Sequence, residues 1–322
     1  MSIRQELNLR YHWSSEIYGQ GKAFRKLLHF PRWMPLIFTS DHAAAVGSDV
    51  DVRCLKLKSL IRLHTTWSQE IRDTIISLQI PRVFPSVMLH PWVQYKNLMR
   101  INRDSNPSGS IFFPHHSSGG ATISGYDDLN CLEFLKSLPE KYHPITICFY
   151  HPDLATSRPE AFQTSGYRVT SAGDTRDYDF IDNFYDLISK FKFAFSEGWG
   201  SQVSYCVDLG IPTMVIPRDI SFDYQEGSSV YFGSEDLLLV RDLQRANKIF
   251  GHLPNSITLN QSDFVRNTLG YGHAELKGKN TCIIWALTLI NFPIWVLVTT
   301  YNVLRILRKQ YFSVKRPLIG SN

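Results

Sequence analysis

Short apolar runs and amphipathic stretches alternate along the central part of the chain, from residue 110 to residue 217. β-branched and aromatic runs predict strands over 110–114, 145–150, 167–170, 193–197 and 213–217. Apolar positions that recur every three or four residues predict helices over 127–138, 180–191 and 201–210, the last closed by Gly210. Strands that alternate with helices of this length predict right-handed crossovers and a mostly parallel sheet.

The first hundred residues show a weaker version of the same alternation. A strand is predicted over 34–42, an amphipathic helix over 67–78, and strand-like runs over 82–91. The polar segment 102–110, with proline and glycine, is the best linker in the chain. We therefore expect an α/β protein with two domains facing a cleft and a tail, divided as 1–105, 106–270 and 271–322.

The composition is that of an ordinary globular protein. With 322 residues, 43% of them hydrophobic and 20% charged, the chain is long enough for two domains. A disordered chain, a collagen-like repeat and a small disulfide scaffold are excluded. The five cysteines form no CxxC pair, so neither a disulfide framework nor a cysteine-based zinc site is indicated, and a reducing compartment is expected.

The net charge of +5 is located in the tail. Residues 270–322 carry seven lysines and arginines against Glu275, so the rest of the chain is close to neutral. No basic stripe is available in the body to neutralise a phosphate backbone, and we expect no nucleic-acid partner.

The tail contains 24 residues without a charge, 281–304, followed by five cations within twelve residues. A helix of that length measures roughly 36 Å, against about 30 Å for the hydrocarbon core of a bilayer, and the cations suit anionic lipid. Pro293 in the middle allows a kink or a re-entrant hairpin. The tail therefore spans a membrane or lies in its interface, the alternative being a buried core helix. The N-terminus has no secretory signal, so we expect a body at the cytoplasmic face of the inner membrane, attached through 281–316.

Ligands of open parallel sheets bind beyond the carboxyl ends of the strands, and four loops of this chain lie there. The loop after 193–197 combines two glycines with a helix N-terminus, a combination that attracts phosphate; the alternative is a tight turn in which Ser201 merely caps the helix. No third ligand is positioned beside the paired histidines, so a metal site is not expected. The candidate ligand-binding residues of the four loops are His115, His116, Ser117, Ser118, Gly119, His151, Gly173, Glu197, Gly198, Gly200, Ser201 and Gln202.

Asp41 and His42 end the predicted strand over 34–42 and would face the cleft. An aspartate next to a histidine offers a general base for a hydroxyl nucleophile, and these two are the candidate catalytic residues. The alternative is a loop that only turns the chain.

The run FAFSEGWGSQVSYCVDLGIPTMVIP, with Gly200-Ser201, Tyr205-Cys206 and the LGIP turn, resembles the nucleotide-sugar-binding half of bacterial GT-B glycosyltransferases that build surface polysaccharides such as capsule and O-antigen. The segment PHHSS is similar to the nucleotide-holding motifs of sialyltransferase-like members. The resemblance implies two Rossmann-like domains, in which the second holds a nucleotide sugar and the first offers a lipid-linked or glycan acceptor. It also implies a transferase that needs no metal or other cofactor. The E-x7-E pattern of many retaining members is absent, so inversion and retention both stay open.

Three other functions remain open. A polyol-phosphate transferase of the CDP-glycerol type shares the two-half fold and the membrane habit. A sugar-nucleotide epimerase shares the fold but acts on a soluble substrate. A non-catalytic membrane adaptor is favoured if the loops at 114–120 and 196–202 face different sides of the molecule.

Overall fold

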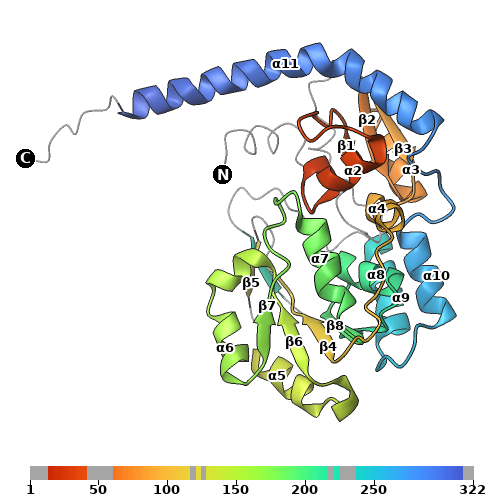
Figure 1. Cartoon of the computed structure of the whole chain (residues 1–322), viewed down its shortest axis with the longest axis vertical. Helices are drawn as coiled ribbons and strands as arrows, with labels where there is room; N and C mark the ends of the chain where they lie inside the picture. Colours follow the sequence, from red (N-terminus) through yellow and green to blue (C-terminus); the bar gives the residue numbers. More distant parts are fainter. Residues whose placement is uncertain are drawn as a thin grey trace, which may run out of the picture.

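The protein is described by a computed structural model that covers residues 14–41, 61–116, 121–124, 128–216, 221–224 and 237–314 (Figure 1). It is a mixed α/β protein with two parallel sheets and, at the C-terminal end of the described residues, one long apolar helix. Some of the sequence predictions concern residues outside the described ranges. These are residues 42 and 117–119, and the cationic end of the tail from residue 315.

The larger sheet has five parallel strands in the order β7-β6-β4-β8-β9. Their bounds are β4 Ser110–Phe113, β6 Ile145–Cys148, β7 Arg168–Thr170, β8 Phe193–Glu197 and β9 Thr213–Ile216. All five strands predicted in this half are confirmed, each within two residues of its predicted limits. The spatial order reverses direction between β4 and β8, which makes that pair the topological switch point of the sheet.

Helices cover both faces of this sheet, because its buried strands are apolar on both sides. Ile111 and Phe113 of β4 face one core cluster, and Phe112 between them faces the other. The helices of the first face are α7 Phe180–Ser189, α8 Ser201–Asp208, α9 Leu237–Phe250 and α10 Leu259–Thr268. The helices of the second face are α5 Asp128–Ser137 and α6 Arg158–Thr164, with 3-10 turns at Glu140–Tyr142 and His151–Ala155. Figure 1 shows α5 and α6 on one side of the strands and α7 and α8 on the other.

The smaller sheet belongs to the N-terminal half and has three parallel strands in the order β1-β2-β3. Its elements are β1 Thr39–Ser40, β2 Arg62–Thr66 and β3 Val83–Val87, with α2 Gln20–Leu28, α3 Gln69–Ser77 and α4 Pro91–Met99. A third, two-stranded antiparallel sheet pairs β5 Ala121–Ser124 with β10 Ser221–Tyr224.

The sequence prediction for this half needs three corrections. The strand expected over 34–42 is only two residues long, Thr39–Ser40. Strand β2 was missed because its sequence RLHTT lacks apolar alternation, although its last four residues are buried. Helix α4 was not predicted, and only its first residue falls in the strand-like run over 82–91. Its first five residues are all buried and show no helical stripe. That burial reflects its position, since Trp92 and Val93 belong to the core cluster of the larger sheet.

The C-terminal part of the chain returns to the N-terminal half. Main-chain hydrogen bonds join His90 to Leu269 and Leu89 to Ala274. The long helix α11, Lys279–Val314, then packs beside α2 and continues without interruption through Pro293, so the re-entrant hairpin is not formed. It is long and apolar enough to cross a membrane over Lys279–Arg305, and only 17% of its most apolar stretch is buried. The alternative of a buried core helix is therefore wrong.

Candidate functional site

The loops that follow β4 and β8 contact each other at the switch point of the sheet. The main-chain N–H of His115 donates to Oε2 of Glu197 at 3.1 Å, and the imidazole ring of His115 lies against Gly198. Gly198 has φ +84°, and a Cβ there would be 2.6 Å from Cε1 of His115. A side chain at position 198 is excluded both by the backbone conformation and by the histidine ring. Two of the predicted loops are thus brought together, so the arrangement that would favour an adaptor, with the loops on different sides, is not found.

Helix α8 begins directly after this contact. Gly200 is its N-cap in extended conformation and provides no side-chain cap, so the alternative in which Ser201 caps the helix is wrong. Ser201 is the first helical residue, and its side chain shares a hydrogen bond with the hydroxyl of Tyr205. The Gln202 amide turns back over Gly200 and donates to Oγ of Ser196 at 2.9 Å. A half-buried turn of glycines therefore leads into a helix N-terminus, which is an arrangement that favours anions.

The other predicted loops lie at the same edge of the sheet but further from the switch point. The ring of His116 lies 4.8 Å from that of Tyr150, one residue before His151. Gly173, with φ +96°, follows β7. Hydrogen bonds from the Arg176 guanidinium hold the pKa of Asp174 below its usual value, and His151 adds to that effect. His115 and His116 thus have different neighbours.

Asp41 follows β1 and forms a buried chain with two residues of the N-terminal sheet. Its Oδ1 lies 3.0 Å from Nε2 of His64 on β2, and Nδ1 of His64 lies 2.9 Å from the Thr39 hydroxyl. His64 is 3% exposed and the Asp41 side chain 14%. Oδ2 of Asp41 is buried and has no hydrogen-bond partner among the described residues. One carboxylate oxygen of Asp41 is therefore held by His64, and the other makes no hydrogen bond within the described residues.

The two halves meet near Asp41 through the start of α2. The Gln20 amide donates to the main-chain oxygen of Asp41 at 3.0 Å and accepts from the Ser40 hydroxyl at 2.7 Å. Two residues earlier, the main-chain N–H of Tyr18 donates to the oxygen of Thr175, and the Tyr18 hydroxyl shares a hydrogen bond with Tyr150. The carboxyl end of β1 is thus connected by a short series of contacts to the carboxyl end of β6.

A second connection runs from β2 to α8 through His90. The His90 ring lies 4.0 Å from Trp67, which follows β2, and its Nε2 lies 3.2 Å from the hydroxyl of Tyr205 on α8. Nδ1 of His90 accepts from the main-chain N–H of Trp92 and so caps α4. Complete burial lowers the pKa of His90 to about 3. The carboxyl ends of both parallel sheets therefore face the same interface.

The depressed pKa of His90 predicts an acid-sensitive fold. Between pH 6.5, the ordinary value, and about pH 3 the unfolded chain binds a proton at His90 that the folded chain does not. The free energy of unfolding should fall as the pH is lowered through this range, by up to about 1.4 kcal/mol per pH unit from this residue. Urea unfolding of wild type and His90→Gln at pH 7, 6 and 5 should show a shallower pH dependence in the variant. The exposed His252→Gln control should keep the wild-type slope; equal slopes for all three proteins would contradict this prediction.

The comparisons with known proteins are sparse. No protein-family model matches the sequence, and no curated protein matches it. Among solved structures, UDP-GlcNAc 2-epimerase from Neisseria meningitidis bound to UDP-GlcNAc is similar, with 14% sequence identity. The match covers 79% of this chain and 70% of that chain, with a TM-score of 0.39. A likeness of this extent does not assign an activity.

Two residues of the candidate site, His64 and Arg158, were not predicted from the sequence. His64 lies 23 residues from Asp41, in the strand that was not predicted, and only the parallel pairing of β1 with β2 brings the two together. Arg158 donates to the main-chain oxygen of His115 at 2.8 Å and lies beside Asp128 at 3.5 Å, which fixes the loop after β4. Nothing in the local sequence around Arg158 signals this contact. His42, Ser117, Ser118 and Gly119 lie outside the described residues.

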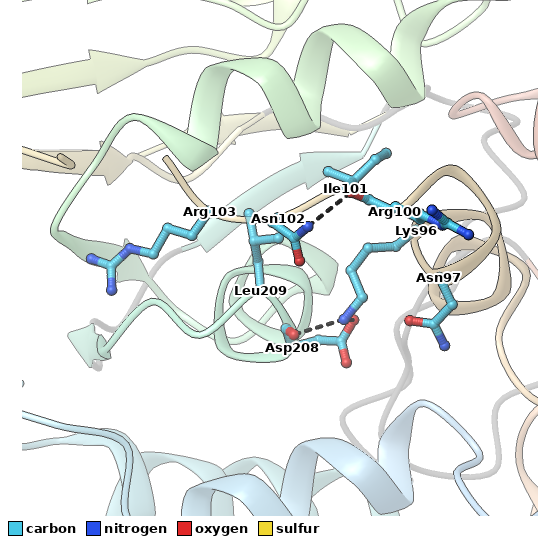
Figure 2. Close-up of a pocket in the computed structure, with 8 residues that line it drawn as sticks. All are labelled: Lys96, Asn97, Arg100, Ile101, Asn102, Arg103, Asp208 and Leu209. Carbon is cyan, nitrogen blue, oxygen red and sulfur yellow. Dashed lines mark hydrogen bonds and ion pairs between the residues drawn. The ribbon is translucent and has the colours of Figure 1, made fainter. Parts of the chain in front are cut away.

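A cavity at the opposite edge of the larger sheet lies between the C-terminal ends of α4 and α8 (Figure 2). Lys96 of α4 contacts the main-chain oxygen of Asp208 at 2.8 Å and its carboxylate at 2.7 Å, and so caps the C-terminal end of α8. Arg103 donates to carbonyls that precede β8 and β9, and Figure 2 shows its guanidinium pointing away from Lys96. Lys96 and Arg103 therefore hold structural carbonyls and do not converge on a ligand.

Proposed function

We propose that the chain is a glycosyltransferase that moves a sugar from a nucleotide-sugar donor to a lipid-linked or glycan acceptor at the inner face of a membrane. The observation that most supports this proposal is that the carboxyl ends of the strands in the two parallel sheets face the same interface. The glycine turn and helix start after β8 supply an anion site on one side, and the Asp41–His64 pair supplies a base on the other.

In this proposal the donor diphosphate or monophosphate lies at the N-terminus of α8. The N–H groups at the start of α8 face the phosphate and stabilise the negative charge that grows on the leaving nucleotide. Gly198 shapes the turn that leads into this helix, because its N–H donates to the Ile216 oxygen and its open side is occupied by the His115 ring. Glu197 is 2% exposed, so we assign it to holding the β4 loop through His115. His116, His151 and Gly173 flank the site toward β6 and β7 and are proposed to contact the nucleoside or sugar hydroxyls.

Asp41 is proposed to act as the general base. Its Oδ2 takes the proton of the acceptor hydroxyl while that oxygen forms a bond to the anomeric carbon of the sugar. The bond from the anomeric carbon to the phosphate oxygen breaks, and its electron pair leaves with the nucleotide. The shorter contact of the Thr39 hydroxyl, 2.9 Å to Nδ1 of His64 against 3.4 Å to the Leu63 oxygen, favours the tautomer with a proton on Nε2. His64 then donates to Oδ1 and orients the carboxylate.

Because His64 acts through Asp41, it is a positioning residue with a distinctive kinetic effect. His64→Leu should lower kcat by about tenfold or more and leave the KM for the donor unchanged, since only the orientation of the base is lost. His64→Gln can still donate to Oδ1 and should recover most of the rate. Thermal midpoints of both variants report on folding. A rise in donor KM with unchanged kcat would instead place His64 in donor binding.

The test of the function is a product analysis with a panel of UDP-, GDP- and CMP-sugars and CDP-glycerol, with and without lipid extracted from bacterial membranes. We expect nucleotide release that depends on the lipid, and a labelled sugar that moves into the lipid fraction. An isomerised nucleotide sugar formed without lipid identifies an epimerase, and transfer from CDP-glycerol alone identifies a polyol-phosphate transferase. Either of these outcomes, or no turnover of any donor, overturns the proposal.

A further inference from the structure

The two faces of α11 have different surroundings along the same stretch of helix. The face toward the protein carries Ile284, Thr288 and Asn291, which are 3%, 2% and 1% exposed. The opposite face carries Ile283, Ile290, Leu297 and Leu304, spaced seven residues apart and 44%, 48%, 70% and 60% exposed. Figure 1 shows α11 running across the N-terminal half and extending beyond its described elements. The first part of the helix, up to Asn291, is therefore docked along one side, while the exposed apolar face continues to Leu304.

The docked face is joined to the protein by polar contacts in the middle of the apolar segment. Asn291 accepts from the main-chain N–H of Ile61 at 3.2 Å and donates to the oxygen of Ile61 at 2.9 Å. The Trp285 indole donates to the main-chain oxygen of Leu28 at 2.9 Å, and its ring lies 4.4 Å from Phe30. A helix that crossed a bilayer with residues 281–304 in its core would have to break all of these contacts. It would also expose Asn291 to hydrocarbon.

The outward face of α11 is long and apolar enough to contact lipid. No charged residue occurs from 281 to 304, and Leu289, Val296 and Tyr301 widen the apolar stripe with 64%, 40% and 65% exposure. Soluble proteins do not usually leave an apolar surface of this length in water. The exposed Arg305 and Arg308 follow at its end, and the sequence adds Lys309, Lys315 and Arg316. This charge complements an anionic headgroup layer.

We infer that α11 lies in the plane of an anionic membrane surface while it stays docked on the N-terminal half. The apolar face enters the boundary between headgroups and acyl chains, and the docked face takes the place of the water-facing side of an ordinary interfacial helix. The acceptor-side half is then held against the bilayer in a fixed orientation. This inference deepens the proposed function, because a lipid-linked acceptor needs such a surface, but vesicle binding can be measured without any transfer assay.

The first test is co-flotation of the full chain with vesicles of phosphatidylcholine containing 30% phosphatidylglycerol (about a physiological fraction of anionic lipid). Ile290→Glu combined with Leu297→Glu places two charges on the outward face, where no packing is lost. It should lower the partition coefficient by roughly a hundredfold, about tenfold per substitution. The control Leu129→Glu changes a leucine that is 72% exposed, on α5 at the far end of the molecule, and should bind like wild type. Equal vesicle binding of all three proteins overturns the inference. It is also overturned if the two glutamates leave vesicle binding unchanged and instead abolish self-association of the chain.

The second test asks whether the helix stays docked on the membrane. Hydrogen exchange of the peptide that contains Ile61 is compared for the vesicle-bound full chain and for Asn291→Leu. The Ile61 amide should stay protected in the bound wild type and exchange at least about tenfold faster in the variant, which keeps its vesicle binding. Fast exchange at Ile61 in the bound wild type would show that α11 leaves the N-terminal half, and would refute an in-plane helix in favour of a spanning one.

Discussion

Replacement of Gly198 by alanine should abolish binding of the nucleotide-sugar donor. The new Cβ would lie 2.6 Å from the His115 ring, so the ring has to shift and the contact between the β4 and β8 loops is disturbed. The same residue has φ +84°, and an L-residue there costs about 1–2 kcal/mol of folding free energy. We expect the dissociation constant of the donor to rise at least about a hundredfold, which corresponds to roughly 2.7 kcal/mol. Isothermal titration with the donor selected by the product analysis measures this.

Gly210→Ala is the matched control for the backbone effect. Gly210 follows α8 with φ +85°, and a Cβ there meets no atom within 4 Å. Both alanine variants should lose a similar amount of stability from the positive φ, and only Gly198→Ala should lose the donor. If Gly210→Ala weakens donor binding equally, the loss reflects general destabilisation and the site is not at the β4–β8 contact.

Asp41→Asn should lower kcat by about a hundredfold to ten-thousandfold and leave donor binding intact. The asparagine side chain has the same shape and still accepts from His64, but it cannot take a proton from the acceptor. Initial rates of nucleotide release, measured with saturating acceptor, report the effect, and titration with the donor reports binding. Asp73→Asn, on α3 of the same half and 61% exposed, is the control that should turn over like wild type. A variant Asp41→Asn that turns over normally would remove Asp41 from the mechanism.

The sequence predicted the larger sheet well because its elements are defined by local patterns. Strands such as Ile145–Cys148 and Phe193–Glu197 are buried on both faces and appear as continuous apolar runs. Helix α7 likewise has an apolar face that turns toward the sheet. The glycines at 198 and 200 marked the loop after β8, because a turn with a positive φ and closely packed side chains leaves a local signature in the sequence.

The N-terminal half and the polar contacts of the site were harder to predict because they depend on tertiary burial. In β2 the buried polar residues His64, Thr65 and Thr66 form hydrogen bonds with residues of β1 and of the following turn. Because these side chains are polar, no hydropathy pattern reveals the strand. The Asp41–His64 pair requires the parallel register of β1 and β2, and the contact of Arg158 with His115 spans 43 residues. Asp41 itself was predicted, but with its sequence neighbour His42 as the partner.

The most direct measurement is hydrogen exchange by mass spectrometry on the full chain with UDP, GDP or CMP at millimolar concentration. Binding at the switch point should slow exchange in peptides that cover 113–116 and 196–205, and should leave peptides over 96–103 unchanged. Slower exchange confined to 96–103 and 208–210, around the cavity between α4 and α8, would contradict the placement of the donor. The same conclusion would follow if none of the three nucleotides slowed exchange anywhere in the chain.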